Sequence, residues 1–173
     1  MNPSIICLPL SDIIDIISVI VDGIGIIVAG SVAIWVVNTI QKRIDNQRSI
    51  KNHLIDEVIE IRRSYREIIN QTTCGELRPK DIKSRLRVLS SRITDLINLI
   101  NIQFKPKVID KDFLLPYQLD LNQIITDDEN FSLEYKANRK FLLTQRSQEK
   151  MVVFSAEKDH LFNELIVKIN KAE

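Results

Sequence analysis

The chain has 173 residues, 27% charged and 45% hydrophobic, with a formal net charge of +1 at pH 7. This near-neutral balance gives little support to a nucleic-acid binder, and we expect no DNA partner. The two histidines, His53 and His160, form no pair at metal-ligand spacing with each other or with cysteine. We therefore expect no metal site and no cofactor.

The first distinctive feature is residues 23–41, which contain no charged side chain, whereas all 24 lysines and arginines follow them. A helix of about 20 apolar residues crosses the ~30 Å hydrocarbon core of a bilayer. Residues 1–41 are therefore predicted to be a transmembrane anchor in the lipid bilayer. Lys42 and Arg43 at its end favour a cytoplasmic C-terminal side and an N-terminus outside. The expected location is a bacterial inner membrane, crossed once.

Small residues recur every four positions within this segment, at Gly25, Ala29 and Ala33. This spacing lets helices approach closely, and Asp22 lies on the same stripe one turn earlier. The pattern predicts that Asp22, Gly25, Ala29 and Ala33 form a membrane association face in a homo-oligomer. Asp22 has two interpretations, since it could face the helix interface or lie at the outer edge of the bilayer.

Residues 42–75 are predicted to continue the anchor as a stalk helix with coiled-coil spacing. Its seam positions are Ile44, Gln47, Lys51, Leu54, Val58, Ile61, Tyr65 and Ile68. Gly75 is expected to end this helix and Pro79 to begin the next. The second helix repeats Ile82, Leu86, Leu89, Ile93, Leu96 and Ile100. The short connection predicts an antiparallel hairpin.

Residues 76–173 complete the predicted cytoplasmic helical domain, which makes the fold all-α. Residues 101–125 are expected to be irregular, and Thr126 to cap a third helix that runs to about Gln145. Residues 151–154 allow a strand, a bend or a continuing helix. A final helix carries Leu161, Leu165, Ile166 and Ile169.

Enzymatic motifs are absent from the sequence: no glycine follows Gly75, and there is no G-x-S-x-G turn. We expect no enzyme and assign no catalytic residue. The remaining candidate is a basic tip, where the hairpin turn and a rising third helix would meet. Its predicted ligand-binding residues are Arg78, Lys80, Lys83, Arg146 and Lys150. Such a cluster suits a phosphorylated ligand, and the alternative is a solvated helix end offset by nearby acids.

The architecture resembles the CRISPR-associated membrane effectors that bind cyclic tetra-adenylate. The resemblance rests on the membrane region over residues 12–40, the basic edge at Lys42 and Arg43, the all-helical domain, and the lack of enzymatic motifs. It implies an oligomer in antiviral defence that senses a cyclic oligoadenylate and perturbs the membrane. The alternative function is a membrane-tethered scaffold that docks a protein partner.

Overall fold

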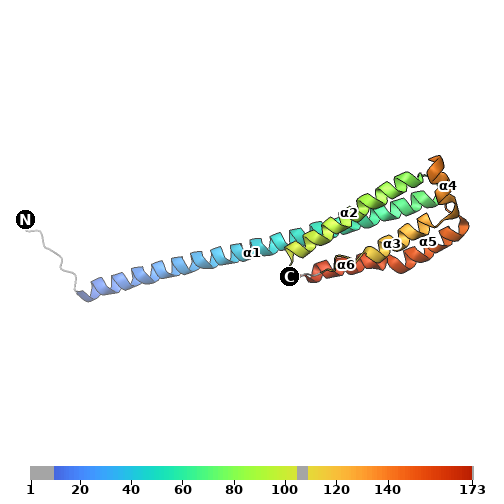
Figure 1. Cartoon of the computed structure of the whole chain (residues 1–173). Coiled ribbons are helices and arrows are strands. Elements are labelled where there is room, and N and C mark those ends of the chain that lie inside the picture. The colour runs from blue at the N-terminus through green and yellow to red at the C-terminus, as the bar shows by residue number, and fades with distance from the viewer. Residues whose placement is uncertain (1–9, 105–108, 173) are drawn as a thin grey trace, which may run out of the picture. The chain divides into compact units, whose positions relative to one another are not determined.

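The computed structural model describes residues 10–104 and 109–172, with side chains described from Ile27 onward. This part of the chain forms six α-helices and no strand, so the predicted all-α class is confirmed (Figure 1). The helices are α1 (Leu10–Thr73), α2 (Pro79–Gln103), α3 (Leu115–Thr126), α4 (Glu129–Ala137), α5 (Gln145–Lys158) and α6 (His160–Lys171). The chain divides into two compact units at Ser49–Ile50, and the second, over residues 50–172, is called the helical unit.

The predicted membrane anchor requires a correction. Among the residues that the structure describes, no helix has a segment both long and apolar enough to cross a membrane. From Ile27, α1 offers about 15 residues before Lys42 and Arg43, whereas a span needs about 20. By this finding the transmembrane helix over residues 1–41 is wrong, and so is the single-pass placement in a bacterial inner membrane. Residues 1–9 lie outside the described residues.

The turn between α1 and α2 follows the sequence prediction. Gly75 has φ of 68°, a left-handed conformation that glycine adopts without a steric penalty. The amides of Gly75 and Glu76 donate to the carbonyls of Thr72 and Gln71, at 3.1 and 2.8 Å, and so satisfy the end of α1. Pro79 then occupies the first turn of α2, as predicted.

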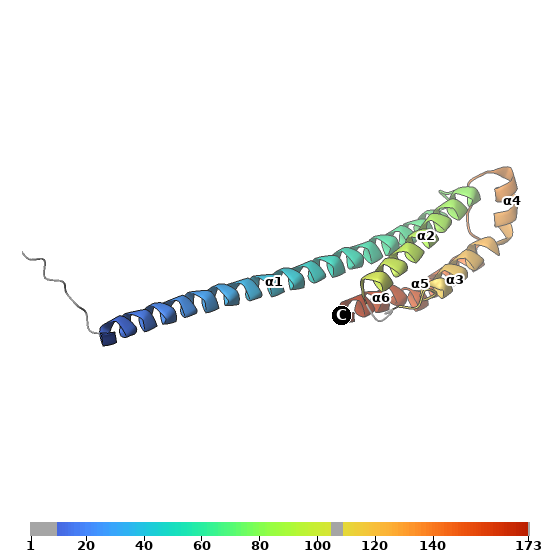
Figure 2. The ribbon, with the colours of Figure 1, turned by 60° about the vertical axis from the view of Figure 1, so that its left-hand side comes forward.

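Helices α1 and α2 form the predicted antiparallel hairpin (Figures 1 and 2). Arg92 of α2 donates to Glu57 of α1 at 2.7 Å, and Arg85 donates to Gln71 at 2.8 Å, so rising numbers on α1 meet falling numbers on α2. The buried stripes follow the expected spacing, although Leu86 is only partly buried and Ile44 is exposed. They consist of Leu54, Val58, Ile61, Tyr65 and Ile68 on α1, and Ile82, Leu89, Ile93, Leu96 and Ile100 on α2.

The second half of the helical unit differs from the prediction. Residues 101–125 were expected to be irregular, but residues 101–103 belong to α2 and residues 115–125 to α3, whose last residue is Thr126 instead of a cap. Asp128 caps α4 instead, since its carboxylate accepts from the amide of Asn130 at 3.0 Å. The predicted third helix from Thr126 to Gln145 is therefore wrong, because α4 ends at Ala137 and Asn138 adopts a left-handed conformation with φ of 53°.

Residues 151–154 lie within α5, and the expected last helix is present as α6. Both views place α2 along α1, and α4 at the end where α1 turns into α2 (Figures 1 and 2). The amide of Phe141 donates to the carbonyl of Leu77 at 2.9 Å, which ties the segment before α5 to this turn.

An aromatic cluster joins the hairpin to the other helices. Tyr65 of α1 lies 5.2 Å from Tyr117 of α3, and Tyr117 lies 4.8 Å from Phe154 and 5.0 Å from Phe162, measured between ring centroids. All four side chains are at most 4% exposed. Aromatic rings contribute large buried areas and favour such tilted and edge-on contacts. The core of the helical unit is therefore continuous across α1, α3, α5 and α6.

Candidate functional site

Three of the five predicted ligand-binding residues, Arg78, Lys80 and Lys83, lie near the start of α2, but their contacts differ. Arg78 donates to Asp81 at 2.7 Å, so a carboxylate on the same helix offsets its charge. Lys80 and Lys83 lie instead against α4. The Lys83 amine is 5.5 Å from the ring centroid of Phe131 and 5.1 Å from that of Tyr135.

The other two predicted residues, Arg146 and Lys150, line a groove of about 480 Å³ between α3 and α5. Four carboxylates share this lining with them, together with a third cation. The acidic residues are Asp120, Asp127, Glu149 and Glu157. The third cation, Lys158, forms an ion pair with Asp120 at 3.1 Å. The groove therefore offers an anion no net positive charge.

A different groove, of about 400 Å³, lies between α2 and α3, and we call it the α2–α3 groove. Its lining consists of Tyr65, Lys83, Leu86, Arg87, Ser90, Leu115, Gln118, Leu119 and Asn122. Two cations and no carboxylate belong to this set. Sequence reasoning assigned Lys83 to a ligand site but missed the other members. The signal was available on α2, where Lys83, Arg87 and Ser90 recur at the spacing of one helix face.

Tyr65 lies at the α1 side of the α2–α3 groove, and its side chain is 1% exposed. Burial raises the pKa of its hydroxyl well above the ordinary value of 10.0, so the group stays protonated and can donate. The hydroxyl has no hydrogen-bond partner among the described residues. Thr72 Oγ1 is the one fully buried, unpaired side-chain polar atom in this part of the chain. The Tyr65 hydroxyl must therefore reach accessible space.

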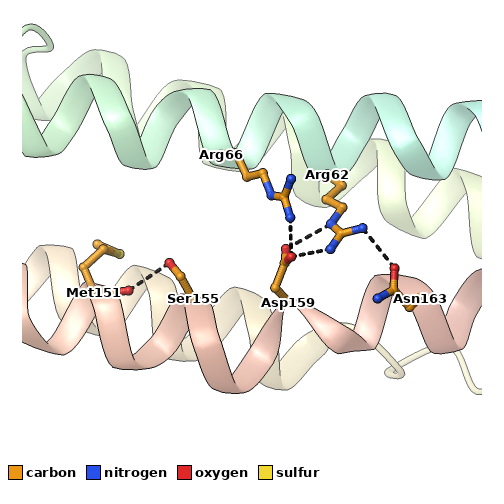
Figure 3. Close-up of polar contacts among 6 residues, drawn as sticks. All are labelled: Arg62, Arg66, Met151, Ser155, Asp159 and Asn163. Carbon is orange, nitrogen blue, oxygen red and sulfur yellow. Dashed lines mark hydrogen bonds and ion pairs between the residues drawn. The ribbon is translucent and has the colours of Figure 1, made fainter.

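A separate polar cluster joins α1 to the junction of α5 and α6 (Figure 3). Arg62 and Arg66 both pair with Asp159, and Arg62 also donates to Asn163 at 2.9 Å. The Arg62 guanidinium, more than the Arg66 one, holds the pKa of Asp159 below its usual 3.8. These contacts tie the start of α6 to α1.

A run of exposed apolar side chains lies on α1 before the helical unit, over residues 27–44, and is called the apolar segment. Its exposed large side chains are Ile27, Val28, Val32, Ile34, Trp35, Val36, Val37, Ile40 and Ile44. At about 100° per residue they surround the helix completely. Ala29 and Ala33 of the predicted association face are exposed here, whereas the side chains of Asp22 and Gly25 lie outside the described residues.

The described residues contain no group of three or more His, Cys, Asp or Glu side chains that could hold a metal. Cys74 is an exposed free thiol, and His160 lies 3.5 Å from Glu164 on the surface of α6. No protein-family model, curated protein or solved structure matches the chain. The candidate sites therefore stand on geometry and charge: the apolar segment of α1 and the α2–α3 groove.

Proposed function

We propose that this chain is a self-assembling helical scaffold, in which the apolar segment of α1 packs against copies of itself. The single observation that carries the proposal is the exposure of that segment. Trp35 is 68% exposed, Ile27 69% and Ile34 66%, in a segment whose apolar side chains point to every side of the helix. A helix segment of this kind is normally buried, because exposing its apolar surface to water is unfavourable.

The identity of the covering partner follows from the seam of α1. In the helical unit, Leu54, Val58 and Ile61 follow a 3-4 spacing and are 1% exposed. The same spacing continues toward the N-terminus through Lys51 and Gln47 to Ile44, Ile40 and Val37. A 3-4 spacing is the pattern with which like helices pack side by side. From Ile44 toward the N-terminus, where the seam is exposed, a second copy would offer a matching seam.

Small side chains support close packing of identical helices. Ala29 and Ala33 lie on one face, where small side chains let two helices approach closely. A surface that matches itself is what symmetric homo-oligomers use. The assembled chain would present several copies of the helical unit at once, which gives a scaffold its avidity for a partner.

The test uses the one tryptophan of the chain, Trp35, as a native reporter. The full chain is diluted stepwise, and tryptophan emission is recorded beside mass from sedimentation. We expect a mass of at least twice 20.0 kDa and a blue-shifted, quencher-protected emission, both lost together on dilution. A monomer with solvent-exposed Trp35 at every concentration contradicts the proposal. So does a monomer in which Trp35 becomes shielded only after lipid vesicles are added.

The expected binding of cyclic tetra-adenylate, and a role in antiviral defence, remain predictions from the resemblance alone. The five residues predicted for that ligand lie in separate environments, with Lys83 in the α2–α3 groove and Arg146 and Lys150 in the groove between α3 and α5. Scaffolding has the stronger support, because the exposure of the apolar segment demands a partner.

A further inference from the structure

We propose that the α2–α3 groove binds the phosphate group of a small phosphorylated molecule. Phosphate would lie between Arg87 and Lys83, and the body of the molecule would lie on the apolar wall. A volume of about 400 Å³ is within the range of small-molecule sites, at roughly 300 to 1,000 Å³. The proposal concerns the helical unit alone and is independent of assembly.

The charge of its lining distinguishes the α2–α3 groove from the groove between α3 and α5. The nearby acids on the same two helices are already engaged, Asp81 with Arg78 at 2.7 Å and Asp120 with Lys158 at 3.1 Å. No carboxylate lines the α2–α3 groove, so the charge of Arg87 is not offset there. Arg87 has no hydrogen bond or ion pair with any described residue, and its guanidinium is a forked donor that matches phosphate oxygens.

Two aromatic rings of α4, instead of a carboxylate, contact the Lys83 amine. The amine lies over the rings of Phe131 and Tyr135, at 5.5 and 5.1 Å from their centroids. A ring face attracts a cation but carries no net charge. The contact therefore restricts the side chain while it leaves the positive charge for an anion.

Neutral groups complete the groove. The protonated Tyr65 hydroxyl reaches accessible space and has no hydrogen-bond partner, so it is free to donate a hydrogen bond to a ligand. Ser90 donates to Gln118 at 2.7 Å, which bridges α2 and α3 and fixes the groove width. Leu86, Leu115 and Leu119 supply an apolar wall beside these groups. Apolar walls with a few convergent polar groups are typical of small-molecule sites.

The experiment titrates the full chain with phenyl phosphate, which combines a phosphate with a small apolar body, and measures affinity by calorimetry. Phenol is the uncharged control ligand. We expect saturable binding of phenyl phosphate, competition by inorganic phosphate and none by phenol. Arg87→Gln should raise Kd roughly tenfold or more, since a charge-assisted contact is lost. Tyr65→Phe, which keeps the ring, should raise Kd several-fold.

Arg146→Gln is the matched control, because it removes the same charge from the groove between α3 and α5. It should leave Kd unchanged, and circular dichroism melts should show that each variant folds. An equal loss of affinity in Arg146→Gln would mean that phosphate responds to diffuse charge, and the proposal fails. It also fails if wild type shows no saturable binding up to about 10 mM, a concentration well above weak millimolar affinity.

Discussion

The exposure of Ile40 gives a quantitative prediction for assembly. Ile40 lies on the seam of the apolar segment and is 54% exposed. Full burial of an isoleucine side chain is worth about 1.5 to 3 kcal/mol, so covering the exposed half contributes roughly 1 to 1.5 kcal/mol per copy. Two copies give roughly 2 to 3 kcal/mol, or about 30- to 150-fold in the association constant.

Ile40→Glu should remove at least this contribution, because the seam would also bring two carboxylates together. Sedimentation equilibrium of the full chain measures the association constant across a concentration series. Val88→Glu is the control, since Val88 is 58% exposed on α2 and receives the same change outside the apolar segment. If both variants weaken assembly equally, or if neither does, the assignment of the seam is refuted.

Three further predictions concern the stability of the helical unit, measured by denaturant unfolding. Phe162→Ala, at a fully buried site, should cost about 3 to 5 kcal/mol. Gly75→Ala should cost about 1 to 2 kcal/mol or more, because φ is 68° and the new methyl would lie 3.2 Å from Leu142 Cδ1. Asp128→Ala should cost about 2 to 4 kcal/mol, because a helix cap and the bond from the Thr144 amide at 2.9 Å are both lost. Unchanged unfolding midpoints would contradict each of these in turn. Burial would raise the pKa of Asp128, but hydrogen bonds from Ser147, Thr144 and Asn130 outweigh burial and hold this pKa below 3.8. The stability that Asp128 contributes is therefore complete above pH 3.8 and is lost as pH falls through the lowered pKa.

The hairpin could be predicted from sequence because its signals are local. A 3-4 spacing of apolar residues, a glycine that tolerates positive φ and a proline in the next first turn each act within a few residues. The result was a correct boundary at Gly75 and a correct buried stripe from Leu54 onward. Tertiary packing reinforced the local preferences in this region.

The third-helix prediction failed because three candidate capping residues follow one another. Thr126, Asp127 and Asp128 can each accept a hydrogen bond at the start of a helix, and the sequence gives no order of preference. In the structure Asp128 also accepts from the amide and hydroxyl of Thr144, at 2.9 and 2.8 Å. Residues 16 positions apart therefore select the cap, and a local pattern cannot contain that information.

The acids beside the predicted ligand-binding residues could not be foreseen from sequence for a related reason. Counting bases at one end of a bundle ignores the acids that neighbouring helices contribute. Arg146 and Lys150 were expected to attract an anion, but α3 brings Asp120 and Asp127 to the same groove. Arg87 was not among the predicted site residues, and only the position of α3 makes it part of a groove.

The polar positions of the α1 seam separate its two apolar stretches. The Lys51 amine donates to the carbonyl of Asn170 at 3.0 Å and lies 5.7 Å from the Phe104 ring centroid, so the covered part of the seam ends at this residue. Gln47 precedes it, and the apolar seam resumes only at Ile44. Polar residues at seam positions reduce stability but specify register, since a shifted pairing of two copies would set Gln47 against isoleucine. The seam is therefore covered by its own chain from Lys51 onward, and the exposed part before Lys51 is the part that the proposal assigns to other copies.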